Sequence, residues 1–174
     1  MILDVSLIVA IGNRRQIGST TRSDLLWYVK EDLQQFRRLT QDKILIVGRK
    51  TFDALPKSMV NSGNRTFHVI SRSQFSSTPN VRYFSSLKSA ILEGGNNSII
   101  IGGGEIYRSS LTDPEILPLI GTIHLSRINT DIEGDVYFPE LPPCFSLESS
   151  IKHPSSTSDG ISWEYCVYEN ASGF

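Results

Sequence analysis

Over the first two thirds of the chain, short apolar runs alternate with segments in which apolar residues recur at helical spacing. Runs without polar alternation, such as ILIV at 44–47 and SIII at 98–101, are typical of strands buried on both faces of a parallel sheet. Between such runs, apolar residues recur at helical spacing. The pattern predicts strands at 4–12, 43–48, 66–71, 81–84, 98–102, 122–128, 145–151 and 162–169, and helices at 28–39, 51–55, 87–92 and 105–111.

The last two strand segments alternate more regularly, which indicates an antiparallel hairpin at the edge of a sheet. Strands that alternate with helices favour an α/β fold with helices on both faces of a parallel sheet. The segments richest in Pro, Ser, Asn and Gly, at 56–64, 73–80 and 153–160, are short enough to be surface loops. The sequence therefore predicts a single three-layer α/β domain over residues 1–174.

Composition narrows the class of protein. Apolar residues make up 39% and charged residues 20%, as in soluble globular proteins, and a net charge of −1 provides no basic surface for nucleic acid or anionic membranes. No apolar run approaches the ~20 residues of a transmembrane helix. Asp4 interrupts the apolar start and no basic segment precedes it, so we expect no signal peptide. We expect a cytoplasmic monomer without a metal site, in which Cys144 and Cys166 are free thiols.

The segment LLWYVKEDLQQF, residues 25–36, places an acid on an apolar helical stripe. Val29, Leu33 and Phe36 recur at helical spacing, and Asp32 lies between them on the same face. One interpretation is a solvated acid near a helix N-terminus, where the macrodipole stabilises negative charge. The other is a carboxylate in an apolar cleft, with a raised pKa, that binds a cationic or amidine-like ligand or manages a proton.

A glycine run follows the strand predicted at 98–102. In IIIGGGEIY, residues 99–107, an apolar strand leads into three glycines and then a helix, so the backbone N–H groups of the first helical turn are open to an anion. The alternative is a tight turn that requires positive φ, for which one or two glycines would suffice. The segment favours a phosphate site.

Cations and hydroxyls end two other predicted strands. Arg49, Lys50 and Thr51 follow one strand, and Ser71 and Arg72 follow another. Ligands of open α/β sheets bind at the carboxyl ends of the strands. Each group alone is typical of a solvated surface. Together with the glycine run, they indicate a ligand with several phosphates.

Five motifs, in this order, resemble the dihydrofolate reductase family over the full length of the chain. They are SLIVAIG (6–12), LLWYVKEDLQQFRRLT (25–40), ILIVGRKTF (44–52), IIIGGGEIY (99–107) and EGDVYFPE (133–140). The resemblance implies an eight-stranded, mostly parallel sheet with four main helices. It also implies reduction of 7,8-dihydrofolate to tetrahydrofolate by NADPH, with a hydride to C6 and a proton to N5, in support of one-carbon and thymidylate metabolism.

On the substrate side, the resemblance assigns catalytic roles to Asp32, Trp27 and Ser126. Asp32 would accept hydrogen bonds from the pterin 2-amino group and adjacent ring nitrogen, and would favour protonation at N5 through a water that Trp27 helps to order. Ser126, a threonine in many members, would hydrogen-bond the carboxylate. Arg65 would bind the α-carboxylate of the glutamate tail as a bidentate pair. The apolar residues expected around the rings are Ile8, Val9, Leu33, Phe36 and Leu55.

On the cofactor side, the cations at the strand ends favour NADPH over NADH, because NADH would leave them without the 2′-phosphate. Thr51 would contact the pyrophosphate. The bond between Gly102 and Gly103 is cis in the family. The residues expected to bind the cofactor are Ala10, Ile17, Gly18, Gly48, Arg49, Lys50, Thr51, Ser71, Arg72, Ile101, Gly102, Gly103, Gly104, Glu105, Ile106 and Tyr107.

The chain departs from the family pattern next to its acidic helix. Leu26 and Lys30 stand where the family usually has proline, and the loop at 19–26 is about two residues longer than the common form. That loop closes over the nicotinamide, and Asp135 matches an acid that steadies it. His68 occupies a strand position that is usually apolar, and we interpret it as a satisfied or edge-facing histidine.

The segments VGRKTF, GGGEIY and EGDVYFPE are similar to mobile-element, trimethoprim-insensitive members, which often carry glutamate at the position of Asp32. The expected ligands are thus dihydrofolate and antifolate inhibitors. Two other functions stay open. The related NADPH reductase of riboflavin synthesis lacks the pattern formed by Trp27 and Asp32. A pterin- or nucleotide-binding module without activity would not need the full set of Asp32, Ser126, Arg65 and the glycine run.

Overall fold

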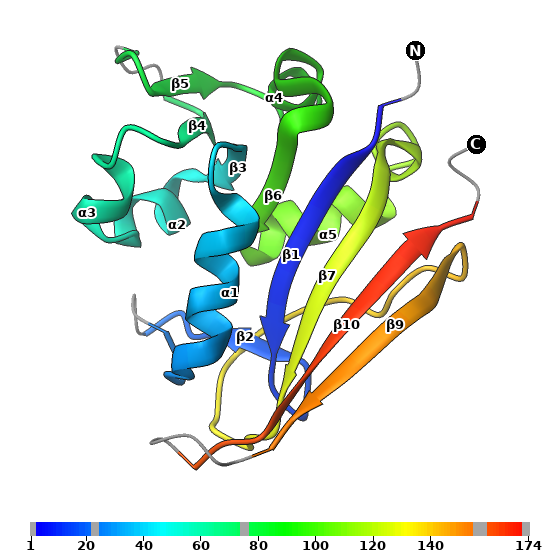
Figure 1. Ribbon diagram of the computed structural model, residues 1–174. Helices are drawn as coiled ribbons and strands as arrows, with labels where there is room; N and C mark the ends of the chain where they lie inside the picture. Colours follow the sequence, from blue (N-terminus) through cyan, green and yellow to red (C-terminus); the bar gives the residue numbers. More distant parts are fainter. Residues whose placement is uncertain (1–2, 22–24, 74–76, 155–159, 172–174) are drawn as a thin grey trace.

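A computed structural model describes residues 3–21, 25–73, 77–154 and 160–171 (Figure 1). Its main sheet has eight strands in the order β5-β4-β3-β6-β1-β7-β10-β9. Neighbours from β5 to β7 pair in parallel, whereas β10 pairs antiparallel with β7 and β9, which confirms the predicted edge hairpin. The strands are β1 Val5–Ile11, β3 Ile44–Gly48, β4 Thr66–Ile70, β5 Val81–Phe84, β6 Ser98–Gly102, β7 Ile120–Ile128, β9 Phe145–His153 and β10 Trp163–Asn170.

Two short strands outside this sheet were not predicted. β2 (Gln16–Gly18) and β8 (Val136–Tyr137) pair antiparallel with each other. Segments of three and two residues are too short to show a two-residue period. Residues 22–24 of the loop predicted to be longer, and residues 74–76 and 155–159 of two predicted surface loops, lie outside the described residues.

The described residues form five α-helices, where four main helices were expected. The additional helix is α3, a single turn after Pro56 inside a segment predicted to be a loop. Pro56 is its N-cap, and the Pro56 carbonyl accepts hydrogen bonds from the N–H groups of Met59 and Val60, although Pro and Ser suggested only a loop. The helices are α1 Lys30–Thr40, α2 Arg49–Ala54, α3 Lys57–Val60, α4 Leu87–Gly94 and α5 Gly104–Thr112, with 3₁₀ turns η1 Gly95–Asn97 and η2 Leu117–Leu119.

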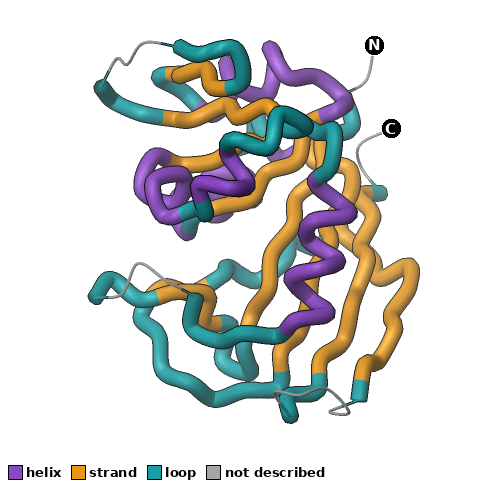
Figure 2. Tube along the Cα trace, turned by 60° about the vertical axis from the view of Figure 1, so that its left-hand side comes forward, coloured by secondary structure: helices purple, strands orange, loops and turns teal. Residues whose placement is uncertain are grey.

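Side chains of β1 alternate between the two faces of the sheet, and each face has its own core. On one face Val5, Leu7, Val9 and Ile11 pack with residues of α4 and α5. On the other face Ile8 belongs to a cluster against which residues of α1, α2 and α3 pack. Figure 2 shows α1 lying along the strands. Helices therefore cover both faces, as the apolar strands required.

The carboxyl ends of the parallel strands gather the starts of three helices. β3 leads directly into α2, and β6 reaches α5 through Gly103. The first turn of α1 lies over β7, whose Ser126 is opposite Ala10 near the end of β1. Within the described ranges no helix is both long and apolar enough to cross a membrane. Cys144 and Cys166 are free, as predicted.

Candidate active site

Asp32 lies in the first turn of α1 and faces the sheet. Its Oδ1 accepts a hydrogen bond from Ser126 Oγ at 2.6 Å, and Ser126 is only 4% exposed. Burial raises the pKa of the Asp32 carboxyl above its usual value, while the Ser126 hydrogen bond and the charge of His153 act in the opposite direction. Of the two interpretations of Asp32, the structure favours the partly buried carboxylate with a raised pKa over the solvated acid. Such a group is suited to hold or exchange a proton.

An apolar wall lies beside this carboxylate. Ile8, on the α1 face of β1, belongs to the cluster against which Phe36 and Leu55 pack. Leu33 is half-buried one residue after the acid. Val9 does not join the wall, because its side chain packs in the core of the opposite face. The strand period explains this, since neighbouring residues of a strand point to opposite faces.

Trp27 packs at the start of α1 in a third cluster. Its buried members are Val29, Ile128 and Trp163, and Trp27 packs against them together with Ala10 and other partly buried residues. Ile128 follows Ser126 by two residues and lies on the same face of β7, so this cluster lies beside the Ser126–Asp32 contact. We call Val29, Ile128 and Trp163, with Trp27 packed against them, the apolar platform.

Arg65 is 9% exposed and bridges β4 to the end of α1. Its Nε donates to Thr40 Oγ1 at 3.1 Å, one Nη to Asn64 Oδ1 at 3.1 Å and the other Nη to the Arg37 carbonyl at 3.0 Å. A guanidinium has five N–H donors, so one N–H on each Nη is left for an external carboxylate. Burial and the Arg37 charge lower the pKa of Arg65.

Near Leu55, a cavity of about 330 Å³ is lined by Phe52, Asp53, Leu55, Lys57, Val60 and Asn61.

The glycine run forms a tight passage between β6 and α5. The Gly102–Gly103 peptide bond is cis, as the resemblance implied, and Gly102 has φ of 121°, which L side chains rarely adopt. A Cβ on Gly103 would lie 2.7 Å from Thr51 Oγ1. Tyr107 Oη donates to the Ile8 carbonyl at 2.7 Å, and burial raises the pKa of this phenol. The glycine turn is thereby fixed beside both Thr51 and the apolar wall.

The two strand ends that carry cations are adjacent in the sheet. Gly48 and Ile70, which end β3 and β4, are directly opposite each other, so the residues that follow lie at one edge of the sheet. Arg49 Nε donates to Asp53 at 2.9 Å along one face of α2, and both side chains are substantially exposed. Lys50 and Arg72 are exposed and Ser71 is half-buried beside them. This edge carries positive charge close to the glycine turn.

Of the other expected cofactor positions, Gly48 and Ile106 lie close to the same turn, whereas Ile101 and Ile17 pack in the cores of opposite faces of the sheet. A Cβ on Gly48 would lie 3.2 Å from Ile106 and 3.8 Å from the backbone of Gly102 and Gly103. Ile101 is 8% exposed in the α1-side core, and Ile17 packs on the other core. Gly104 begins α5, Glu105 is exposed in its first turn, and Gly18 ends β2.

Asp135 holds the loop that follows β2. Its carboxylate accepts from the Thr20 N–H at 2.7 Å and from Thr20 Oγ1 at 2.5 Å, and these hydrogen bonds lower the pKa of Asp135. The Asp135 N–H donates to the Gly18 carbonyl at 3.0 Å. Sequence reasoning identified the acid but not Thr20, because the two residues are 115 positions apart.

His124 and Tyr165 form a second polar pair that sequence reasoning missed. His124 Nδ1 lies 2.6 Å from Tyr165 Oη, and burial and Lys43 lower the pKa of His124. Tyr165 is opposite Ser126 in register. The indication available in the sequence was that polar residues, among them His124 and Ser126, occupy alternate positions of the strand predicted at 122–128. His68 is buried, with Nδ1 3.1 Å from the Ala90 carbonyl, so the interpretation of a satisfied histidine is supported.

Comparisons with known proteins agree with this geometry. A family model described as dihydrofolate reductase matches residues 4–170. Dihydrofolate reductase type 1 of Escherichia coli is 38% identical over 174 residues, covering 96% of this chain and 99% of that protein. Type 6 of Proteus mirabilis is 36% identical, covering 95% and 98%. The dihydrofolate reductase of Bacillus subtilis (strain 168) is 29% identical, covering 95% and 94%.

The family match spans nearly the whole chain, and the relatives align over almost their full lengths. On these grounds the chain belongs to the dihydrofolate reductase family.

Proposed function

We propose that this chain reduces 7,8-dihydrofolate to 5,6,7,8-tetrahydrofolate with NADPH. The observation that carries the proposal is the Asp32 carboxylate, which lies partly buried on an apolar platform and, among the described residues, accepts one side-chain hydrogen bond, from Ser126. Its second oxygen is left to bind a ligand. A pterin offers a 2-amino group and a ring N–H side by side, which match the two acceptor oxygens of a carboxylate.

Asp32 binds and orients the pterin and holds the proton balance of the site. Burial raises the pKa of the Asp32 carboxyl, so the group holds a proton more readily than a solvated acid, which favours protonation at N5 through a water ordered by Trp27. Ile8, Phe36 and Leu55 pack against the rings and exclude other water. Leu33 completes this wall in the proposal.

Arg65 fixes the opposite end of the substrate. Three of its N–H groups are bound within the protein, and the two that remain form a fork for the α-carboxylate of the glutamate tail. Because Thr40, Asn64 and the Arg37 carbonyl hold the guanidinium in one orientation, little conformational entropy is lost on binding.

The residues around the glycine turn fit NADPH. A side chain at Gly103 would collide with Thr51 Oγ1. Because glycine has no side chain, the backbone there and the Thr51 hydroxyl lie close together, and both would bind a pyrophosphate. Arg49, Lys50, Ser71 and Arg72 would hold the 2′-phosphate. When bound, NADPH supplies the hydride for C6.

One assay tests the function. The purified chain is mixed with NADPH and dihydrofolate, and the fall in absorbance at 340 nm is followed. We expect turnover that Asp32→Asn slows severely. Turnover of a riboflavin precursor instead of dihydrofolate would favour the related reductase, and binding of NADPH without any turnover would favour a binding module.

We also propose that the enzyme tolerates trimethoprim. The support is the similarity of VGRKTF, GGGEIY and EGDVYFPE to trimethoprim-insensitive members and the identity of 36–38% to the type 1 and type 6 relatives. An inhibition curve for trimethoprim under the same assay tests this. Inhibition at nanomolar concentration would contradict it.

We further propose that the protein is cytoplasmic, that it is a monomer and that it forms one three-layer domain. Gel filtration tests the oligomeric state.

A further inference from the structure

A buried amide joins the two loops next to the β2–β8 pair. Gln16, the first residue of β2, is only 1% exposed. Its Nε2 donates to the Ile132 carbonyl at 2.8 Å and to the Thr130 carbonyl at 3.2 Å, and its Oε1 accepts from the Arg14 N–H at 2.9 Å. Both N–H groups and the oxygen of the amide are therefore in use. The side chain links the turn that follows β1 to the segment between β7 and β8.

The β2–β8 pair is short and depends on side chains for its attachment. β2 has three residues and β8 has two, and an isolated pair of short strands is marginally stable in water. Other attachments come from Arg15, whose guanidinium donates to two backbone carbonyls, and from Asp135, which binds Thr20. Arg15 is half-buried and Asp135 is exposed, so the attachment through Gln16 is the best shielded of the three and the most costly to lose.

Packing beside the pair is incomplete. A cavity of about 270 Å³ lies there, so apolar contacts alone do not hold the two loops together. The residues that line this cavity are Arg14, Gln16, Ile132, Glu133, Gly134 and Tyr137.

The β2–β8 pair lies against the glycine turn. A Cβ on Gly104, the first residue of α5, would lie 2.6 Å from Cγ1 of Val136 in β8. Val136 is paired in register with Gly18 of β2, which we expect to bind NADPH. A Cβ on Gly134 would lie 2.5 Å from the Gly18 carbonyl and 3.3 Å from Cβ of Gln16. A displacement of the pair would therefore change the space beside both Gly18 and the start of α5.

We propose that Gln16 is a positioning residue for NADPH: its amide holds the β2–β8 pair against the glycine turn, in the arrangement to which the cofactor binds. The inference rests on the proposed function and adds a residue that acts on the cofactor through Gly18 and Gly104. Fixing these backbone positions before binding reduces the ordering that NADPH would otherwise have to impose.

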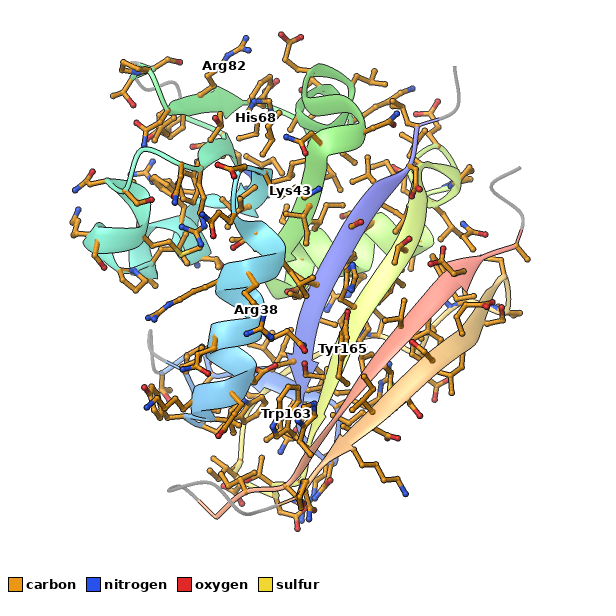
Figure 3. The ribbon with its side chains drawn as sticks, in the orientation of Figure 1. Arg38, Lys43, His68, Arg82, Trp163 and Tyr165 are labelled. Atoms are coloured by element: carbon orange, nitrogen blue, oxygen red, sulfur yellow. The ribbon has the colours of Figure 1, made fainter. Side chains whose placement is uncertain are left out.

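The substrate groups lie apart from this attachment. Among the described residues, the hydrogen bonds of Gln16 do not involve Asp32 or Ser126. Those two side chains meet between α1 and the main sheet, where Figure 3 shows Trp163 and Tyr165. Loss of the Gln16 amide should therefore affect NADPH rather than dihydrofolate.

A matched pair of variants distinguishes positioning from stability. Gln16→Met keeps the length of the side chain and removes its donors and acceptor. Asn170→Leu is the control, because Asn170 is also 1% exposed and its Nδ2 donates to the carbonyls of Leu117 at 3.3 Å and Ile120 at 3.0 Å, at the opposite end of β7. Each variant removes two hydrogen bonds of a buried amide, so we expect Tm to fall by similar amounts.

NADPH is titrated by fluorescence without dihydrofolate. We expect its Kd to rise about fivefold to tenfold in Gln16→Met and to stay within about twofold of the parent in Asn170→Leu. The KM for dihydrofolate at saturating NADPH should stay within about twofold in both variants. In the protein without cofactor, hydrogen exchange at residues 16–18 and 135–137 should become faster in Gln16→Met alone.

The proposal fails if Gln16→Met binds NADPH as tightly as the parent, or if Asn170→Leu weakens binding equally, which indicates a loss of stability alone. Should Gln16→Met not fold, Gln16→Asn replaces it. Its amide is one methylene shorter and should retain at most one of the two donated hydrogen bonds, with a smaller rise in Kd. Failure of the proposed function is separate: a parent that binds NADPH without reducing dihydrofolate would still show the effect of Gln16 on Kd, whereas a parent that does not bind NADPH would overturn both.

Discussion

The Asp32 carboxylate is subject to opposing influences at the scale of single residues. Burial in the first turn of α1 raises its pKa, whereas Ser126, which donates at 2.6 Å, favours the ionised form. Ser126 thus keeps the ionised form accessible although burial favours the protonated one. The two side chains therefore act as a unit.

Replacing Asp32 with Asn tests the acid itself. The amide is nearly the same size, so we expect the fold and NADPH affinity to be retained. It cannot manage a proton, so we expect kcat to fall by a factor of about 10²–10⁴, most severely at pH 7 and above. Single-turnover rates and NADPH titration by fluorescence measure the two effects. A near-normal rate at pH 7 to 8 would remove Asp32 from its assigned role.

Replacing Ser126 with Ala tests the hydroxyl. Loss of the donor removes an influence that lowers the pKa of Asp32, so we expect the falling limb of the pH profile to move to higher pH. Unfolding should become easier by about 1 kcal/mol, because Ser126 is buried and Asp32 loses its partner. Ser126→Thr is the control, since it retains the hydroxyl and should restore the profile. A shift of equal size in Ser126→Thr would show that strand packing, not the hydrogen bond, is responsible.

Single residues also mark how far sequence reasoning reaches. The break that Asp32 makes in an apolar stripe was visible in the sequence, and so was its position one turn from Phe36. The hydrogen-bond partners of Arg65 were not visible in the sequence, because Thr40 lies 25 residues away and is brought to Arg65 by the fold. A period in the sequence identifies the face of an element, but not what that face contacts.

At the scale of elements, short segments hold two loops together. β2 and β8 hold the loops around Gly18 and Asp135 together, and Asp135 binds both donors of Thr20. Neither strand was predicted, nor was α3, since each is at most four residues long and has no complete period. The long elements were predicted to within a few residues, because burial of one or both faces fixes their pattern.

The contact between Thr20 and Asp135 carries a prediction at this scale. Asp135→Ala removes two acceptors from an exposed surface, so we expect Tm to change little. We expect kcat to fall severalfold, because the loop that the proposed function places over the nicotinamide would lose its anchor. Stopped-flow hydride-transfer rates measure the effect. Asp131→Ala, an exposed acid four residues earlier, is the control and should leave the rate unchanged. Equal losses in both variants would argue against a specific anchor.

At the scale of the whole molecule, two cores lie on either side of one sheet, and each contains few polar groups. The strand order was not contained in the hydrophobic pattern, which is the same for any arrangement of buried parallel strands. The resemblance of five ordered motifs to a known family implied an eight-stranded, mostly parallel sheet but gave no order, which the structure supplies. The exceptions to an apolar interior, such as His68 between β4 and α4, are where the stability of the whole molecule depends on pH.

The buried His68 gives the last prediction. Burial lowers its pKa below the usual value, so the unfolded chain binds a proton at a pH at which the folded protein does not. The neutral ring packs on Phe84 at 4.6 Å between centroids, with the Arg82–Glu93 ion pair nearby. As pH falls below about 6.5, the free energy of unfolding should therefore decrease, by at most about 1.4 kcal/mol per pH unit for this one group.

His68→Asn isolates this contribution. Asparagine does not titrate, so the difference in free energy of unfolding between parent and variant should shrink as pH falls from 7.5 to 5. Urea unfolding at a series of pH values measures it. Asp32, whose raised pKa acts in the opposite direction, and His124, whose lowered pKa acts in the same direction as that of His68, are present in both proteins and cancel in the comparison. A difference that stays constant over this range would mean that protonation of His68 does not limit stability in acid.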